Sequence, residues 1–439
     1  SILIIAFTIT VASITLTFFT QITKISTTKA EEKSVVIECM KVDLDIIDID
    51  KFKDFNYMKP IAIDNTANSN NLIDYQVLVN LDTASLISAG KMKSDCGDIR
   101  FTDSDGTTLL NYWLESGCNT ANTKIWVKVN VSASSTKTIY VYYGNPSASS
   151  ASNGDNTFIL FDDFLGNNIN NTKWVVRGMP SISNGVITLD GTDSAIYSSS
   201  VTISQSTSAL VEAKVNSHST VVGARSGMPL IMDVNNIRFP ADNCGDSIQT
   251  RPSIFWSDGR NYVLTDVGAY ITTIGGSATY VYQADISNVP HIFGIWYAPT
   301  SKLYLDGSEV ASITNPPSNT MYIGLATTCT ASSQSIMVDW IRVRKYTSPE
   351  PTITLGNEEN NIIKLILFNK GVNLGKKYLI KITYEDGNVF TKEITLPQNL
   401  NYTQSSVVTL GVPKGVIKYI SVTPLDITCP PIEFPKYKR

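Results

Sequence analysis

The side chains that could do chemistry are few in this chain of 439 residues. There are two histidines, His218 and His291, which is little for a His-based metal centre or acid–base catalysis, and each is expected to be a local structural residue. The sequence has no GxSxG, Gly-rich phosphate-loop, HExxH or GxGxxG pattern. The net charge is −4 and no basic stripe is present, so nucleic acid is not an expected partner. The motifs therefore predict no enzyme.

Six cysteines offer a different chemistry, and no two of them form a Cys-x-x-Cys pair. Zinc and thioredoxin-type sites are thus not indicated. An even number of cysteines behind an export-type apolar segment favours disulfide bonds, although many pairings are possible. Three Asn-x-Ser/Thr sequons, at Asn130, Asn170 and Asn401, are candidate glycosylation sites and agree with a surface location.

One acidic loop has the spacing of a calcium-binding turn. It reads Asp103-Ser-Asp105-Gly106 and lacks the downstream pattern of an EF-hand. The alternative interpretation is a solvated hairpin turn. No cofactor is predicted with certainty, and calcium is the candidate ion.

The first 23 residues carry no charge and are mostly Ile, Leu, Phe, Val, Ala and Thr. A helix of this length is about 35 Å long, enough to cross a bilayer core. Because it is apolar on all sides, it is expected to be buried on all sides, first in lipid and then among copies of itself. Head-to-tail packing that does not close produces a helical filament. The apolar side chains expected to drive assembly are Ile2, Leu3, Ile4, Ile5, Phe7, Ile9, Val11, Ile14, Leu16, Phe18 and Phe19.

This segment stands at the start of a chain that does not begin with Met, as if a peptidase had cut before it. The arrangement resembles type IV pilins and archaeal pilin-like and flagellin-like subunits. The resemblance implies a self-polymerising subunit of an extracellular filament, inserted in the inner membrane before assembly. A single anchor on a monomeric surface lectin or adhesin is the other interpretation.

The remaining chain alternates short Val/Ile/Tyr/Thr-rich runs with turn residues. This pattern predicts a mainly β protein, with a long N-terminal hydrophobic helix at residues 1–30 followed by three β-sandwich domains. Residues 55–150 form the first unit, with DIRFTDSDGTTLLNYW, KIWVKV and TIYVYYGNP in that order. It resembles an uncharacterised β domain that recurs in archaeal and bacterial cell-surface proteins and has no assigned catalytic site.

Residues 151–356 form a second unit, which begins LFDDFLGNNINNTKW and ends VDWIRVRKY. It resembles the concanavalin-A/laminin-G-like jelly roll of legume lectins and laminarinase-type glycosidases. Such glycosidases carry Glu-x-Asp-x-(x)-Glu on one strand, because hydrolysis needs two carboxylates. The corresponding stretch here has only Glu212, followed by Lys214 where a second acid is expected. The resemblance therefore implies the fold without the activity.

The same resemblance implies two kinds of binding site. Asp339 and Asp163 match positions that hold calcium in laminarinase-like jelly rolls, and a structural Asp that caps backbone amides is the alternative. Glycan binding is the second expectation, with strand aromatics as stacking surfaces or, alternatively, as core residues. The candidate aromatics are Trp256, Tyr262, Tyr270, Tyr280 and Tyr282.

The last unit, residues 357–439, begins NNIIKLILFNKG and resembles the head sandwich of archaeal pilins and flagellins. Residues 31–54 have no other partner, so we expect them to complete this head around the inserted domains. A row of separate domains with a linker strand is the alternative. This division into domains favours three disulfides, Cys96–Cys118, Cys244–Cys329 and Cys39–Cys429. The sequence as a whole predicts a non-enzymatic subunit of a type IV pilus-like filament, with outer domains that contact glycans or surfaces.

Overall fold

The computed structural model describes residues 42–46, 54–191, 194–218, 227–233, 253–258, 266–272, 279–285, 290–327, 335–358, 361–369, 375–399, 401, 404–412, 417–426 and 432–435. Within those ranges, no helix is both long enough and apolar enough to span a membrane. The helix predicted at residues 1–30, with the side chains expected to drive assembly, lies outside them. The prediction of a mainly β protein built from several sandwiches is confirmed.

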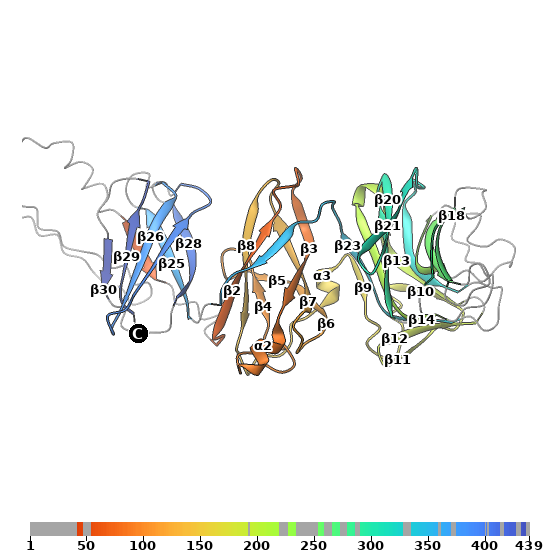
Figure 1. Ribbon diagram of the computed structural model, residues 1–439, viewed down its shortest axis with the longest axis horizontal. Helices are drawn as coiled ribbons and strands as arrows, with labels where there is room; N and C mark the ends of the chain where they lie inside the picture. The colour runs from red at the N-terminus through yellow and green to blue at the C-terminus, as the bar shows by residue number, and fades with distance from the viewer. Residues whose placement is uncertain are drawn as a thin grey trace, which may run out of the picture.

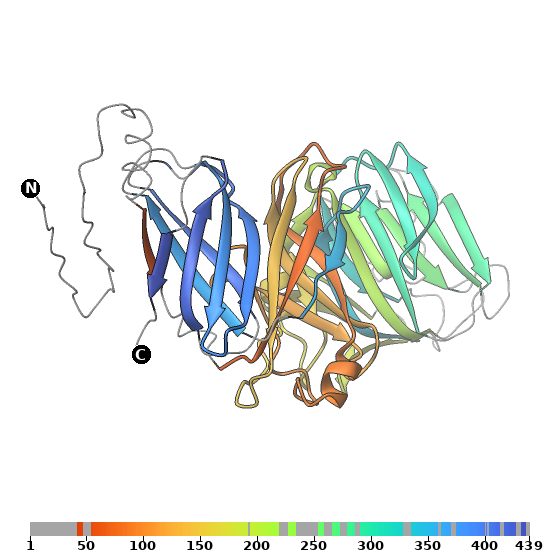
Figure 2. The same cartoon turned by 60° about the vertical axis from the view of Figure 1, so that its left-hand side comes forward.

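Three β-sandwiches lie in a row (Figure 1). We call them the C-terminal sandwich, the middle sandwich and the jelly roll, and the middle sandwich separates the other two. The same order is visible after a rotation of 60° (Figure 2). Each sandwich has its own cluster of buried apolar side chains, so each has a separate core.

The middle sandwich packs the sheet β24-β2-β8-β4-β5 against the sheet β3-β7-β6. On β7, Ile125, Val127 and Val129 point into the core, while Lys124 and Trp126 point away from it, as expected for a strand with a period of two. The bounds are β2 Tyr57–Asp64, β3 Leu72–Leu81, α2 Thr83–Ser88, β4 Arg100–Thr102, β5 Leu109–Leu110, β6 Tyr112–Ser116, β7 Thr123–Val131, β8 Thr136–Tyr143 and β24 Thr352–Leu355.

The jelly roll consists of two antiparallel sheets, ordered β10-β13-β22-β15-β16-β17-β18 and β11-β12-β23-β14-β19-β20-β21, with β9 paired to β23. Its core lies between them. The bounds are α3 Gly154–Thr157, β9 Leu160–Asp162, β10 Trp174–Arg177, β11 Ser181–Ser183, β12 Val186–Asp190, β13 Ala195–Ile203, a 3-10 turn Gln205–Thr207, β14 Ala209–His218, β15 Gly227–Asp233, β16 Ser253–Asp258, β17 Asp266–Thr272, β18 Thr279–Asp285, β19 His291–Tyr297, β20 Thr300–Leu305, β21 Ser308–Thr314, β22 Met321–Ala326 and β23 Ser335–Lys345. The jelly-roll architecture expected from the sequence is thus present.

The C-terminal sandwich packs the sheet β1-β25-β28 beside the sheet β27-β26-β29-β30. On β26, four alternate side chains are buried, namely Tyr378, Ile380, Ile382 and Tyr384. The bounds are β1 Val42–Ile46, β25 Asn361–Asn369, β26 Lys377–Tyr384, β27 Val389–Thr395, β28 Ser405–Val412, β29 Ile417–Pro424 and β30 Ile432–Pro435.

Two strand pairings between segments far apart in the sequence show that each domain is inserted in the next. β1 pairs antiparallel with β25, so a strand before the middle sandwich joins a sheet that follows the jelly roll in sequence. β24 pairs with β2 and therefore belongs to the middle sandwich, although its residues fall in the range that the sequence assigned to the jelly roll. The alternating pattern of apolar residues in β24 identifies a strand but not its partner. The partner depends on which sheet edge lies beside the strand in the folded chain. The jelly roll is an insertion in the middle sandwich, which is itself an insertion in the C-terminal sandwich.

Candidate binding site at the junction of two domains

The outer face of β23 is where the jelly roll contacts the middle sandwich. Strand alternation directs Ile341 and Val343 into the jelly-roll core and turns Trp340, Arg342 and Arg344 outward. Outside a jelly-roll sheet such residues would normally face water. Here they are 2–4% exposed, because the sheet β3-β7-β6 of the middle sandwich covers them.

An aromatic cluster fills this junction. It joins Trp113 and Trp126 of the middle sandwich to Phe161 and Trp340 of the jelly roll, with Phe158 between them. The guanidinium carbon of Arg342 lies 4.3 Å from the ring centroid of Trp340 and 4.5 Å from that of Trp126. A desolvated cation between two indole rings is stabilised by the ring quadrupoles, by about 2 kcal/mol in favourable cases.

Three carboxylates from three parts of the chain neutralise the two arginines. Glu212 on β14 accepts from Arg342 Nε at 2.7 Å and from Arg344 Nε at 3.0 Å. Glu115 on β6 lies 2.6 Å from Arg342 Nη1, and Glu350, before β24, lies 2.5 Å from Arg344 Nη1. Neither arginine is left as an isolated buried charge, which would be strongly unfavourable.

Hydrogen bonds from uncharged donors complete the network. Trp126 Nε1 donates to Glu115 Oε2 at 2.6 Å, and the Tyr75 hydroxyl donates to Glu350 Oε1 at 2.8 Å. Gln76 joins the domains through its amide, accepting from Lys345 N at 2.9 Å and donating to the Thr157 carbonyl at 2.8 Å. The junction is therefore fixed by directional contacts as well as by apolar packing.

These surroundings set the protonation states. Burial by itself would raise the pKa of Glu212, but the neighbouring Arg342 and Arg344 lower it to about 2. Burial and the adjacent Glu350 raise the pKa of Tyr75 well above its ordinary value. At neutral pH the Glu212 side chain is therefore ionised, and the Tyr75 hydroxyl keeps its proton.

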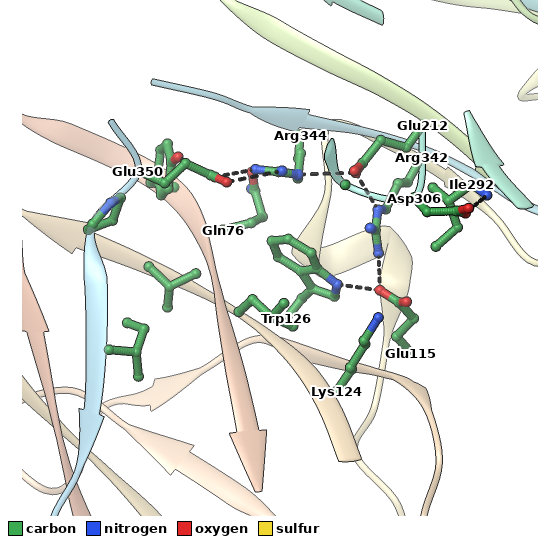
Figure 3. A pocket seen from close by; sticks show the side chains of 16 residues that line it. Gln76, Glu115, Lys124, Trp126, Glu212, Ile292, Asp306, Arg342, Arg344 and Glu350 are labelled. Atoms are coloured by element: carbon green, nitrogen blue, oxygen red, sulfur yellow. Dashed lines mark hydrogen bonds and ion pairs between the residues drawn. The ribbon is translucent and has the colours of Figure 1, made fainter. Parts of the chain in front are cut away.

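Beside the network lies a cavity of about 260 Å³, which we call the junction cleft (Figure 3). Both domains contribute to it, with Lys124, Glu115 and Trp126 on one side and Glu212 and Asp306 on the other. Its complete lining is Tyr75, Gln76, Val77, Leu78, Glu115, Lys124, Trp126, Glu212, Ile292, Asp306, Gly307, Arg342, Arg344, Glu350, Pro351 and Ile353. Ligand sites are common in such clefts between domains.

The sequence pointed to Glu212 in this region and to none of the aromatic or arginine side chains around it. A signal was present, because VDWIRVRK places a Trp and two Arg on one face of a strand whose other face is apolar. Charged residues at alternate positions of a strand normally predict a face in contact with water. Only knowledge of the covering domain would have indicated that this face is buried.

The carboxylates expected to bind calcium have protein partners in this structure. Asp339 forms an ion pair with Lys214 at 2.5 Å, and Asp163 Oδ1 accepts from Leu165 N at 3.4 Å. Asp103 is paired with Lys137 at 2.7 Å, and Asp105 accepts from the backbone of Thr107 and Thr108, as in a closed hairpin turn. In the described part of the chain, no three Asp, Glu, His or Cys side chains are grouped so that they could bind a metal ion.

Of the three expected disulfides, Cys96–Cys118 is present, with the two Cα atoms 6.0 Å apart. The other four cysteines, Cys39, Cys244, Cys329 and Cys429, lie outside the described residues. Asn130, Asn170 and Asn401 are exposed, as glycosylation requires.

The aromatic residues expected to stack on sugars fall on a different part of the jelly roll. Trp256, Tyr270, Tyr280 and Tyr282 lie on β16, β17 and β18. Tyr262 lies outside the described residues.

One family model matches the chain, described as a domain of unknown function (DUF2341), over residues 95–177. The matched segment runs from the disulfide through β10, so it crosses from the middle sandwich into the jelly roll and includes Trp113, Glu115 and Trp126 of the junction. No curated protein matches the sequence significantly.

Several solved structures are similar to the jelly-roll part. A Bacillus licheniformis β-glucanase shares 16% identity with a TM-score of 0.32, over 43% of this chain and 98% of that one. The legume lectin-like domain from Entamoeba histolytica shares 11% identity with a TM-score of 0.32, over 40% and 91% of the two chains. Carbohydrate-binding module CBM66 from Bacillus subtilis shares 14% with a TM-score of 0.27, over 40% and 96%. Likeness at this level does not transfer a ligand or an activity to this chain.

Proposed function

We propose that this chain is a non-hydrolytic adhesion protein of the cell surface, which presents its jelly roll at a distance from its point of attachment. The observation that carries the proposal is the nesting of the three sandwiches. β1, the first described strand, belongs to the C-terminal sandwich at one end of the row, and the jelly roll forms the other end (Figure 1). A chain attached through residues that precede β1 therefore projects the jelly roll outward.

The environment of Glu212 supports binding rather than hydrolysis. A glycosidase needs one carboxylic acid that retains its proton near the working pH. Glu212 has a pKa lowered to about 2, and Arg342 and Arg344 bind its carboxylate. It acts as an ionic contact between strands and is unsuited to the role of general acid.

The apolar segment of residues 1–23 suggests how the chain is attached. We propose that it polymerises as the core of a type IV pilus-like filament, with the three sandwiches on the outside. A lone membrane anchor on a monomeric surface lectin or adhesin is the second candidate, favoured by the same apolar stretch.

Shearing separates these two candidates. Cells that display the full chain are sheared, and the released material is sedimented and labelled with antibodies against the middle sandwich. Label along filaments is the expected result. Recovery of the chain only from detergent-solubilised membranes would refute the filament and leave the anchored adhesin.

The absence of hydrolysis is tested separately on the purified chain. Incubation with soluble β-glucans is expected to release no reducing ends, for the wild type and for Glu212→Gln alike. Any hydrolysis by the wild type would overturn the non-enzymatic proposal, whether or not Glu212→Gln retains it.

A further inference from the structure

We infer that the junction cleft binds a single neutral sugar unit through adjacent hydroxyl groups. This inference rests on the proposed adhesive function and names the site and the class of ligand. It uses atoms that the ion-pair network leaves unused.

Four polar atoms of the cleft residues have no hydrogen-bond partner among the described residues. The network occupies Glu212 Oε2 and Glu115 Oε2, so Oε1 of each carboxylate remains available. Arg342 bonds through Nε and Nη1 and keeps Nη2, and the Lys124 ammonium forms no ion pair within the described ranges. Glu212 and Arg342 are more than nine-tenths buried, so these available atoms belong to a formed site.

The mixture of donors and acceptors indicates the kind of ligand. A sugar hydroxyl both donates and accepts, so two adjacent hydroxyls can bond to a carboxylate and to a guanidinium at the same time. The lining has four acids, Glu115, Glu212, Asp306 and Glu350, and three bases, Lys124, Arg342 and Arg344. This near balance favours a neutral polyhydroxylated molecule over a phosphate or a polyamine.

Size and rigidity agree with one sugar unit. A volume of about 260 Å³ is below the usual range for drug-sized ligands, about 300–1,000 Å³. The cleft side chains are held before any ligand arrives, since Glu212 is bound by two arginines and Asp306 accepts from Ile292 N at 2.8 Å. Such preorganisation lowers the entropic cost of binding.

The site is composite. Lys124 and Glu115 come from the middle sandwich, and Glu212, Asp306 and Arg342 come from the jelly roll. A sugar unit in the cleft therefore contacts both domains, and neither domain alone offers the complete set of partners.

The test uses the purified full chain and three probes, methyl β-D-glucoside, methyl β-D-galactoside and methyl α-D-mannoside. Binding is measured by saturation-transfer NMR and calorimetry. Lys124→Met removes an exposed partner outside the ion-pair network, so folding is expected to be unaffected. The matched control is Lys128→Met, on the same face of β7 but outside the cleft lining.

At least one glycoside is expected to bind, with affinity lowered tenfold or more by Lys124→Met and unchanged by Lys128→Met. No binding of any probe, or equal loss in both variants, overturns the inference. Surface adhesion is scored in parallel with cells that display the wild type or Lys124→Met. Adhesion by cells whose purified chain binds no glycoside would refute the cleft as the site and leave the proposed function standing.

Discussion

At the scale of single residues, Glu212 shows how surroundings determine the role of a carboxylate. Its strand neighbours Val211 and Ala213 point into the jelly-roll core, so Glu212 points outward into the junction. There Arg342 and Arg344 occupy one of its oxygens at 2.7 and 3.0 Å. The charge is buried yet paired, which makes its removal far more damaging than its presence is stabilising.

Glu212→Gln is therefore expected to destabilise the chain by about 3 kcal/mol, the cost of removing a buried carboxylate that two guanidinium groups share while each keeps one other acid. Glu309→Gln is the matched control, because Glu309 pairs with Lys302 at a site where its side chain is 42% exposed. An exposed pair contributes about 1 kcal/mol or less. Denaturant unfolding of both variants measures the difference, and equal losses would contradict the ion network as described.

The same residue predicts a dependence on pH. The folded pKa of Glu212 is about 2, below the ordinary value of 4.5, because the two arginines outweigh the effect of burial. The stabilisation is complete above pH 4.5 and is lost as pH falls through 2, by an amount on the order of 3 kcal/mol. Denaturant unfolding is measured at pH 5 and at pH 2.5. The decrease in unfolding free energy between these two values should be larger for the wild type than for Glu212→Gln. Parallel slopes would show that another group dominates.

At the scale of elements, β23 and β24 carry the joint between two domains. β23 packs one face into the jelly-roll core and presents the other to the middle sandwich. After the connection 346–351, β24 adds an edge strand to the middle sandwich by pairing Ile61 with Leu355 and Ile63 with Ile353. Because the middle sandwich covers β23 and includes β24, this single stretch of chain contacts both domains.

The disulfide gives an element-scale prediction for the middle sandwich. Cys96 and Cys118 are separated by 22 positions and connect the segment before β4 to the turn after β6. Replacing both with Ala removes a constraint on the unfolded chain and is expected to lower stability by about 3 kcal/mol. Calorimetry should show the transition of the middle sandwich at a lower temperature, with the C-terminal sandwich unchanged. A reductant added to the double variant is the control, and it should have no further effect on the middle sandwich.

At the scale of the whole molecule, the nested order makes the chain cross each joint twice. It passes from the C-terminal sandwich to the middle one after β1 and returns before β25. Near the return, Glu358 bonds to Lys91 and accepts from the Tyr143 hydroxyl at 2.6 Å, which ties the connecting segment to the middle sandwich. Two chain crossings and these contacts restrain the joint, as the proposed projecting adhesion protein would require.

A single cut should therefore leave the molecule assembled. A protease site inserted between Ser150 and Ala151, in an exposed connection, divides the chain into two pieces that share two sandwiches through the β1–β25 and β2–β24 pairings. The cleaved protein is expected to elute as one particle in native gel filtration and to separate under denaturing, reducing conditions. Separation in native buffer would show that the nested pairings do not hold the domains together.

Much of the fold follows from local patterns in the sequence. Alternation along runs such as KIWVKVNV requires strands with one buried face, and the spacing of turn residues leads to sandwiches. The Cys96–Cys118 bond was predictable, because both cysteines fall within one recognisable unit. The junction was not, because Arg342 and Glu115 are 227 positions apart and meet only when two domains dock.

By itself, then, the sequence determined which segments become strands and which face of each strand is apolar. Only the tertiary structure decided the partner of each outward face. It turned Trp340, Arg342 and Arg344 from an apparently solvated face into a buried contact, paired Glu212 with two arginines, and assigned β1 and β24 to sheets far away in sequence. The physical reason is that alternation is encoded within one strand, whereas docking depends on surfaces that several distant strands create together.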